Sequence, residues 1–216
     1  MRKTLPYLRL IVAQWILAAI VWQISDRLSN NLFRPTEYFA YFTIQTSLIA
    51  SVVLTVTAVR EFQGKADTKA LTIARLSVST YAIVVAVVYN ALLRGTKVEA
   101  TDPDFGYVWP VPPNEILHVW GPLFLVLDFA ITLTATKLKF KQIFWVLLFP
   151  LAWLIVTITR GLFTDWWAYW FLNPNLEAGV TGVVTFILGI VVFMLASASI
   201  SLSLNRLTNK AHRENK

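Results

Sequence analysis

Residues 143–158 read IFWVLLFPLAWLIVTI, a run of sixteen residues without a single charge. A second run of this kind, residues 10–24, reads LIVAQWILAAIVWQI. A helix in a soluble core rarely needs an apolar run of such length, whereas a helix that crosses a bilayer needs about 20 predominantly apolar residues. Both runs therefore predict membrane-spanning helices.

The composition of the whole chain agrees with this interpretation. Hydrophobic residues make up 56% of the 216 residues and charged residues only 14%, whereas about a quarter of an average soluble domain is charged. The absence of cysteine excludes disulfides, thiol catalysis and thiolate metal sites. With His118 and His212 as the only histidines, we expect neither a zinc site nor any other metal or cofactor.

The apolar runs predict an all-α fold, a bundle of six transmembrane helices that forms a single domain over residues 1–216. The basic start, Met1-Arg2-Lys3, resembles a signal peptide, but the run that follows is too long and has no clear cleavage site, so we expect an uncleaved first span. The expected spans are residues 7–28, 36–59, 69–93, 114–136, 141–160 and 177–204.

The orientation follows from the positive charges. The net charge is +7, but the basic residues flank the apolar runs rather than forming one patch, so we do not expect a nucleic-acid partner. Fourteen of the 19 lysines and arginines fall on one side of the predicted spans. Since the positive side faces the cytoplasm and the number of spans is even, both termini should be cytoplasmic, in a multi-pass protein of the cell membrane.

Polar side chains inside a bilayer are costly, and each is therefore a functional candidate. Thr43 should lie about seven residues, or roughly 10 Å, below the outer start of its span, and His118 about four residues, or roughly 6 Å. Thr43 and His118 can therefore meet in the outer half of the membrane. Other polar groups are expected near the same level: Gln23, Asp26, Tyr89, Asn90 and Arg160.

Each candidate also has a purely structural interpretation. Glu115 precedes His118 by three residues, so it shares a helix face with the imidazole and could orient it; a histidine hydrogen-bonded for packing is equally compatible. A threonine such as Thr43 commonly bonds back to a carbonyl one turn earlier in its helix. Arg160 and Asp165 flank the outer end of their span, which favours an ion pair over a substrate contact for Arg160.

Two ionisable residues, Arg75 and Asp128, lie toward the inner side of their spans. We expect them to form a structural pair within the bundle.

Several short motifs, in order along nearly the whole chain, carry a resemblance. They are Tyr41-Phe42-Thr43-Ile44-Gln45-Thr46, then Asn90, then His118-Val119-Trp120-Gly121-Pro122 with Asp128, then Arg160-Gly161, Asp165-Trp166-Trp167 and Phe171-Leu172-Asn173-Pro174. In these motifs the chain resembles the androgen-induced protein family, which includes the androgen-dependent regulator of tissue factor pathway inhibitor. It is most similar to the bacterial six-span relatives of that family.

The resemblance implies a function. Animal members of the family are threonine-dependent membrane hydrolases of fatty acid esters of hydroxy fatty acids. By motif, their essential threonine and histidine correspond to Thr43 and His118. The implied partners are membrane lipids and a lipid ester substrate, without a cofactor; the oligomeric state is left open.

A hydrolase of this kind needs donors for the developing oxyanion. Backbone N–H groups inside a helix are already bonded, so the donors should be side chains, or backbone freed near Pro122 or in a loop. The side-chain candidates are Asn90, Gln45 and Tyr89, with Glu115 also at the substrate site. Arg160 is the candidate for holding a free carboxylate of the substrate. The competing classes are a non-enzymatic protein that binds or transports lipids or small molecules, and a structural or signalling membrane component.

Overall fold

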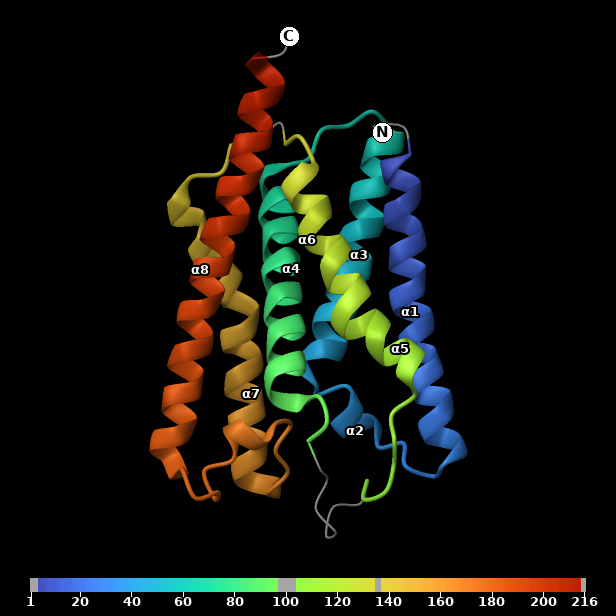
Figure 1. Ribbon diagram of the computed structural model, residues 1–216, viewed down its shortest axis with the longest axis vertical. Helices are drawn as coiled ribbons and strands as arrows, with labels where there is room; N and C mark the ends of the chain where they lie inside the picture. The colour runs from blue at the N-terminus through green and yellow to red at the C-terminus, as the bar shows by residue number, and fades with distance from the viewer. Residues whose placement is uncertain (1–3, 97–103, 135–136, 215–216) are drawn as a thin grey trace.

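The computed structural model describes residues 4–96, 104–134 and 137–214, and within these ranges the chain is helical and contains no strand. Six of its helices are long and apolar enough to cross a membrane. They run along the longest axis of the molecule, and both chain ends lie at the same end of the bundle (Figure 1). The prediction of an all-α, six-span, multi-pass membrane protein is confirmed. We call the end that holds both termini the inner end, and the opposite end the outer end.

The six spans are built from regular and irregular helices. The first three are α1 (Leu5–Ser29), α3 (Phe42–Phe62) and α4 (Lys69–Val88), and α4 continues into a π-helical turn, η1 (Tyr89–Leu93). The fourth joins α5 (Val111–Glu115), a second π-helical turn, η2 (Ile116–Trp120), and α6 (Gly121–Ile131). The fifth joins the 3₁₀ helix η3 (Phe140–Leu147) to α7 (Leu148–Thr164), and the sixth is α8 (Gly179–Glu214). The outer connections contain the short helices α2 (Pro35–Tyr38) and η4 (Trp170–Leu172).

The start of the second span corrects the sequence prediction. Pro35 begins a separate short helix, α2, and the long helix α3 starts only at Phe42, after an extended residue at Tyr41. Side chains satisfy the carbonyls of the break: Gln45 Nε2 donates to Phe39 O and Trp153 Nε1 donates to Ala40 O, both at 2.8 Å. Thr43 therefore lies in the first turn of its helix and not seven residues inside it.

The other spans also differ at their ends. The fourth runs over Val111–Ile131, so it starts three residues and ends five residues earlier than expected. The helix α8 continues beyond its expected end at residue 204 as far as Glu214. The fifth reaches Thr164 at its outer end.

Pro122 explains the π-helical turn in the fourth span. Proline has no N–H, so it cannot donate to the carbonyl four residues earlier, at His118. The amide of Gly121 instead donates to Ile116 O, five residues earlier, which widens the turn. A wider turn of this kind is frequently found at functional sites.

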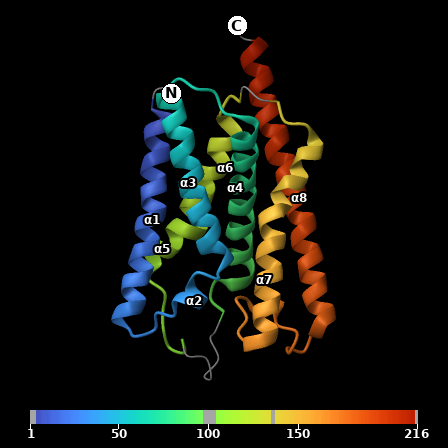
Figure 2. The ribbon, with the colours of Figure 1, turned by 180° about the vertical axis from the view of Figure 1, so that it is seen from behind.

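Two apolar cores hold the bundle together. One lies between α1, α3 and the fourth span, and the other joins α4, α6, α8 and η3. The helix α7 is different, because most of its side chains face outward. It reaches the core through Phe149 and Trp153, whose rings pack against Phe42. In the view from behind, α7 stands between α4 and α8 at the surface of the bundle (Figure 2).

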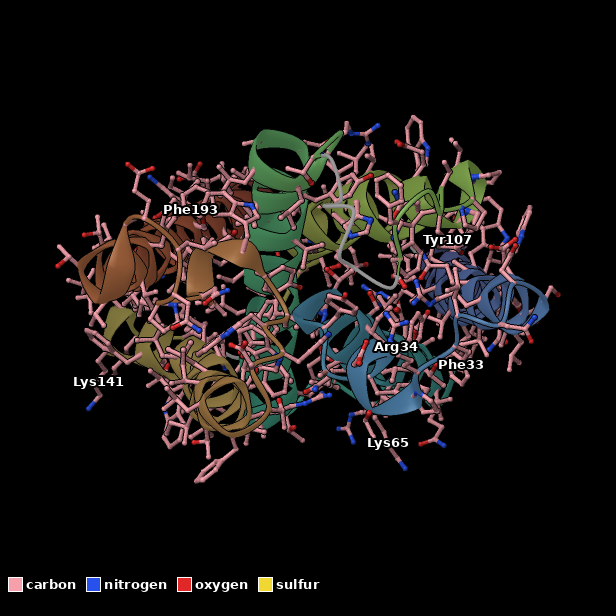
Figure 3. All side chains as sticks on the ribbon, turned by 90° about the horizontal axis from the view of Figure 1, so that it is seen from below. Phe33, Arg34, Lys65, Tyr107, Lys141 and Phe193 are labelled. Carbon is pink, nitrogen blue, oxygen red and sulfur yellow. The ribbon has the colours of Figure 1, made fainter. Side chains whose placement is uncertain are left out.

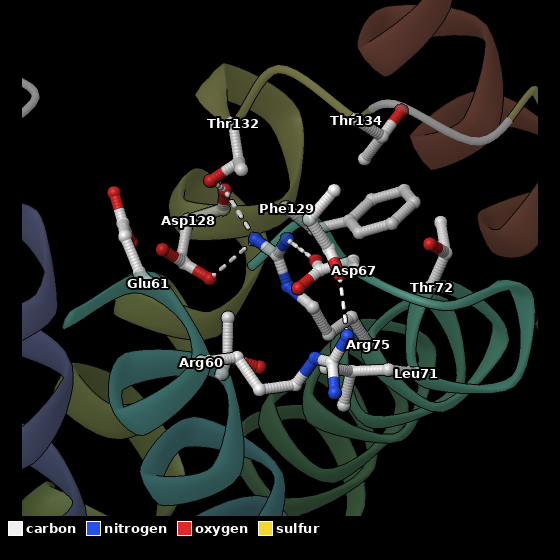
Figure 4. A network of polar contacts seen from close by, with 12 residues as sticks. Arg60, Glu61, Asp67, Leu71, Thr72, Arg75, Asp128, Phe129, Thr132 and Thr134 are labelled. Carbon is white, nitrogen blue, oxygen red and sulfur yellow. Dashed lines mark hydrogen bonds and ion pairs between the residues drawn. The ribbon is translucent and has the colours of Figure 1, made fainter. Parts of the chain in front are cut away.

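At the inner end, a buried cluster of charges joins four spans (Figure 4). Asp128 accepts hydrogen bonds from Arg75 at 2.9 Å and from Arg9 at 2.8 Å, and all three residues are buried. Arg75 also pairs with Asp67 at 2.7 Å, and Arg9 pairs with Glu61. The predicted pairing of Arg75 with Asp128 is confirmed, and Arg9 joins it.

At the outer end, the connection that precedes α5 is fastened to α1. Asp104 accepts two hydrogen bonds from Arg27, at 2.8 and 2.9 Å, and one from Arg34 at 2.8 Å. Tyr107 donates to Asp26 at 2.6 Å. Figure 3, which looks onto this end, shows Arg34 and Tyr107 on the side of the bundle formed by α1, α2 and α5.

Candidate functional site

The first turn of α3 presents unbonded amides to the interior. The first four N–H groups of a helix have no partner within the helix, and Tyr41, the N-cap of α3, supplies no side-chain cap. The hydroxyl of Tyr169 lies close to the amides of Phe42 and Thr43 and to the Thr43 hydroxyl. A tyrosine hydroxyl therefore stands where a cap would be.

The electrostatics of this turn favour an electron-rich oxygen. The aligned peptide dipoles place a partial positive charge at a helix N-terminus, where anions and polarised oxygens are stabilised. Burial raises the pKa of Tyr169, although its contacts with Thr43 and Phe42 work in the opposite direction. Tyr169 is thus a neutral hydroxyl that occupies a position suited to a carbonyl oxygen or an oxyanion.

Thr43 also lines an apolar groove between α3, α4, α7, η4 and α8. The groove contains about 750 Å³ of empty space, part of it open to the surroundings. One wall of the groove is formed by α7, and the others are formed mainly by α3, α4 and α8. Its walls are almost entirely aliphatic and aromatic: Phe42, Thr43, Val84, Val85, Val88, Tyr89, Leu93, Leu147, Pro150, Leu151, Trp153, Leu154, Tyr169, Phe171, Leu172, Ile187, Ile190, Val191 and Met194.

The two π-helical turns bring His118 against one wall of this groove. Tyr89, the first residue of η1, lines the groove and stacks on the His118 ring from η2, with ring centroids 3.8 Å apart and an interplanar angle of 20°. Asn114 Nδ2 donates to the Tyr89 hydroxyl at 2.5 Å. His118 is 9% exposed and Thr43 is 9% exposed, so both are shielded within the bundle.

The hydrogen bond of His118 determines its tautomer. Nδ1 lies 2.9 Å from the backbone carbonyl oxygen of Asn114. A carbonyl only accepts, so Nδ1 carries the hydrogen, and in the neutral ring Nε2 carries the lone pair. Nε2 makes no hydrogen bond to any residue in the described ranges. His118 is therefore oriented as a proton acceptor.

Thr43 and His118 lie near the same end of the bundle. Within the described part of the chain, no hydrogen bond joins their side chains. The Thr43 hydroxyl faces Tyr169, and the Tyr89 ring is the residue that contacts both the groove and His118. The candidate site thus has two parts: the amide end of α3, where Thr43 lines the groove, and the His118 ring, which stacks on the groove residue Tyr89.

Among the other predicted residues, Gln45 and Asn90 are engaged elsewhere. Gln45 donates to the carbonyl of Phe39. Asn90 is exposed, donates to Ala86 O and accepts from Arg94. Neither side chain lines the groove.

Glu115 and Arg160 differ from their expected contacts. The Glu115 carboxylate pairs with Arg94 at 2.6 Å and does not orient His118. The backbone carbonyl of Asn114 contacts the His118 imidazole instead. Arg160 donates to the carbonyl of Thr36 and lies over the Trp166 ring, 4.2 Å from its centroid. The predicted ion pair between Arg160 and Asp165 was wrong: within the described ranges Asp165 accepts from Asn175 and Trp167 instead.

Sequence reasoning missed Tyr169 and the free amides of α3. Tyr169 lies in the aromatic segment 166–171, where nothing in the pattern distinguishes it from neighbours that sit at a membrane interface. The free amides follow from the start of α3 at Phe42, which the sequence pattern does not mark.

Among the residues that the structure describes, no group of three or more histidine, aspartate or glutamate side chains could hold a metal ion. No protein-family model, curated protein or solved structure matches the chain.

Proposed function

We propose that the protein is an intramembrane hydrolase of lipid esters, with Thr43 as the nucleophile and His118 as the base. The observation that carries the proposal is the position of Thr43, in the first turn of an uncapped helix and on the wall of an apolar groove. That position combines a hydroxyl, free amide donors and room for an acyl chain. It agrees with the implication of the family resemblance.

The amide end of α3 removes the main difficulty for a hydrolase made of helices. An oxyanion needs donors that are not already bonded within a helix, and the amides of Phe42 and Thr43, in the first turn of α3, lie close to the Tyr169 hydroxyl. In the proposed mechanism the ester carbonyl oxygen displaces the Tyr169 hydroxyl and accepts from these amides. The N-terminal dipole of α3 then stabilises the negative charge that develops on that oxygen.

The proton follows a path from Thr43 to His118. As the Thr43 oxygen bonds to the carbonyl carbon, its proton passes to Nε2 of His118, either directly after the threonine turns or through one water. The tetrahedral intermediate expels the alcohol, which takes the proton from His118, and leaves an acyl ester on Thr43. Water then attacks this ester with His118 as the base, which releases the carboxylic acid and restores the threonine.

A second function is favoured by one specific observation. The groove wall is nearly all apolar, and Thr43 and His118 share no hydrogen bond within the described ranges. A protein that only binds lipid chains in this groove would have the same lining. Such a protein would bind an ester without cleaving it.

The test uses purified protein with fluorogenic acyl esters and a fluorophosphonate probe that labels activated hydroxyls. We expect Thr43→Ala to abolish labelling and Thr43→Ser to keep it. Replacing His118 by glutamine should lower turnover by about 10²-fold or more, the usual contribution of a general base.

The matched control is Thr46→Ala, one turn further along α3. Thr46 is also buried, but its hydroxyl donates to Phe42 O at 2.8 Å and is not available as a nucleophile. Turnover by wild type that exceeds neither Thr43→Ala nor His118→Gln would rule out the hydrolase and leave lipid binding. Equal losses in Thr43→Ala and Thr46→Ala would assign the effect to folding.

A further inference from the structure

A second pocket lies at the inner end, far from the apolar groove. It is lined by residues 134 and 137–139, which lie between α6 and η3, and by residues of α8 between Leu202 and Lys210. Figure 1 shows this part of α8 near the C-terminal end of the chain. It contains about 1120 Å³ of empty space, part of it open to the surroundings.

The pocket concentrates positive charge. Lys137, Lys139, Arg206 and Lys210 line it, and no aspartate or glutamate is among its described lining residues. Within the described ranges the only ion pair made by these four cations is an exposed one, between Lys210 and Glu214 at 3.7 Å. Four like charges around one cavity repel each other, so an anion inside it would be stabilised.

The wall of the pocket is fixed by hydrogen bonds. Arg206 donates to Leu138 O at 2.5 Å and lies over the Phe140 ring, 4.2 Å from its centroid. This uses one of the five donors of the guanidinium and leaves the others for a ligand. Asn209 accepts from the Thr134 amide at 3.2 Å, which ties the connection to α8.

The pocket lies at the depth of lipid headgroups. A helix needs about 20 residues to cross the hydrocarbon, so α8, which enters at Gly179, leaves it near residue 200. The lining residues of α8 begin with Leu202, a buried apolar side chain, and continue with polar and basic ones toward Lys210. An occupant would therefore place an apolar part toward the membrane and an anionic part among the cations.

We propose that this pocket binds the phosphate headgroup of an anionic membrane lipid. Basic pockets between transmembrane helices on the positively charged side of a membrane protein are suited to such headgroups. Arginine and lysine together supply both a planar fork and point charges for phosphate oxygens. The apolar floor and the depth of the pocket select a lipid over free phosphate.

The test titrates the purified protein in detergent with phosphatidylglycerol, with phosphatidylcholine and with inorganic phosphate, and counts bound lipids by native mass spectrometry. We expect saturable binding of phosphatidylglycerol at one site, in preference to phosphatidylcholine, that weakens as ionic strength rises. The double variant Lys137→Gln/Lys139→Gln should bind phosphatidylglycerol about 25-fold more weakly, about fivefold for each lysine. Both lysines are exposed and neither forms an ion pair within the described ranges, so the variant should fold.

The matched control is Lys65→Gln/Lys141→Gln, which removes the same charge from the same end. Both lysines are exposed, lie outside the pocket lining and project away from the bundle (Figure 3). We expect less than a twofold change in this control. Equal losses in both double variants would show diffuse attraction and overturn the site, and inorganic phosphate that competes with the lipid at equal affinity would overturn the assignment to a lipid.

Discussion

Asp128 receives guanidinium groups from two different helices, which makes it the central residue of the inner charge cluster. Its two oxygens are divided between Arg9 and Arg75, and its side chain is only 4% exposed. A buried pair gains little over well-packed apolar residues, but the loss of one partner leaves an uncompensated charge in a low dielectric. Removing any one charged residue of the cluster should therefore destabilise the folded protein.

We predict that Asp128→Asn destabilises the protein by about 3 kcal/mol, because both arginines lose their shared anion. For a chain of this size the melting temperature in detergent should fall by about 6 to 12 °C. The control is Glu214→Gln, which removes an exposed carboxylate from its pair with Lys210 and should change stability by less than about 0.5 kcal/mol. Similar melting curves for Asp128→Asn and wild type would contradict this account.

The residues of this cluster also show what a sequence can predict. Arg75 and Asp128 were expected to pair because both are charged at a similar inner depth, and charges in a bilayer seek partners. The part played by Arg9 cannot be predicted in this way, because its inward direction depends on the rotation of α1 about its own axis. The contact of Tyr169 with Thr43 was likewise not predictable, since it depends on how an outer connection folds back over the groove.

At the scale of elements, the two π-helical turns η1 and η2 carry Tyr89 and His118, whose rings stack on each other. Each widens its helix by one residue at the point where Tyr89 and His118 meet. In η2 the cause is Pro122, whose missing N–H prevents the regular bond to His118 O. The position of His118 relative to α4 is therefore set by a proline four residues further along the chain.

We predict that Pro122→Ala lets the turn close into a regular α-helix and rotates His118 away from Tyr89. The change restores an N–H and removes a poor helix former, so stability should not fall by more than about 1 kcal/mol. The measurement is the NMR signal of the His118 ring, which the stacked Tyr89 ring shifts upfield; His212 is the only other histidine. The signal should move downfield, and ester turnover should fall about tenfold or more.

Pro6→Ala is the control for this change, because Pro6 lies in the first turn of α1, where an N–H has no helical acceptor. Neither the His118 signal nor turnover should change in it. An unchanged His118 signal in Pro122→Ala would show that packing, and not the proline, holds the wide turn.

The irregular elements also explain why the span boundaries were only partly predictable. Pro35 is a valid start signal, but it starts α2, and the break before Phe42 is stabilised by Gln45 and by Trp153 from a distant span. Apolar length predicts that a span exists, because it follows from the bilayer thickness. It does not predict where the helix begins, because that depends on tertiary hydrogen bonds.

The outer connection should be sensitive to acid. Burial alone would raise the pKa of Asp104, but hydrogen bonds and charges from Arg27 and Arg34 outweigh it and hold the pKa below the ordinary value. A depressed pKa means that the pairing stabilises the folded protein fully above the unfolded value, about 4, and that this stability is lost as the pH falls through the lower folded value.

We predict that Asp104→Asn lowers the free energy of unfolding by about 2 kcal/mol at neutral pH, the usual value of charge-assisted hydrogen bonds. The difference in melting temperature between wild type and Asp104→Asn should shrink as the pH is lowered below about 4. A difference that stays constant from neutral to acid pH would assign the effect to something other than this carboxylate.

At the scale of the whole molecule, both termini lie at one end, and the excess of positive charge predicts that this end is cytoplasmic. Since the natural chain has no cysteine, single introduced cysteines report accessibility without background. We predict that a membrane-impermeant maleimide labels Asn175→Cys on intact cells and labels Gln63→Cys only after permeabilisation. The reverse pattern would invert the orientation.

At this scale the most consequential feature is the apolar groove beside Thr43, one wall of which is formed by α7. In the proposed hydrolase this space holds the acyl chain, so its volume should set chain-length preference. Val191 lines the groove, whereas Val192, the next residue of α8, is 67% exposed on another face.

A phenylalanine at position 191 would enter the groove without displacing packed core, so we predict that Val191→Phe leaves the melting temperature nearly unchanged. Turnover of long-chain esters should fall about tenfold or more, because burying each methylene contributes about 0.8 kcal/mol and several would be excluded. Turnover of acetyl esters, which need only the amides of α3 and the pair Thr43–His118, should remain. Val192→Phe adds the same side chain outside the groove and should alter neither. A uniform loss for short and long esters in Val191→Phe would mean that the acyl chain binds elsewhere. Only an acyl chain that occupies the groove would contact a side chain at position 191 and not one at position 192.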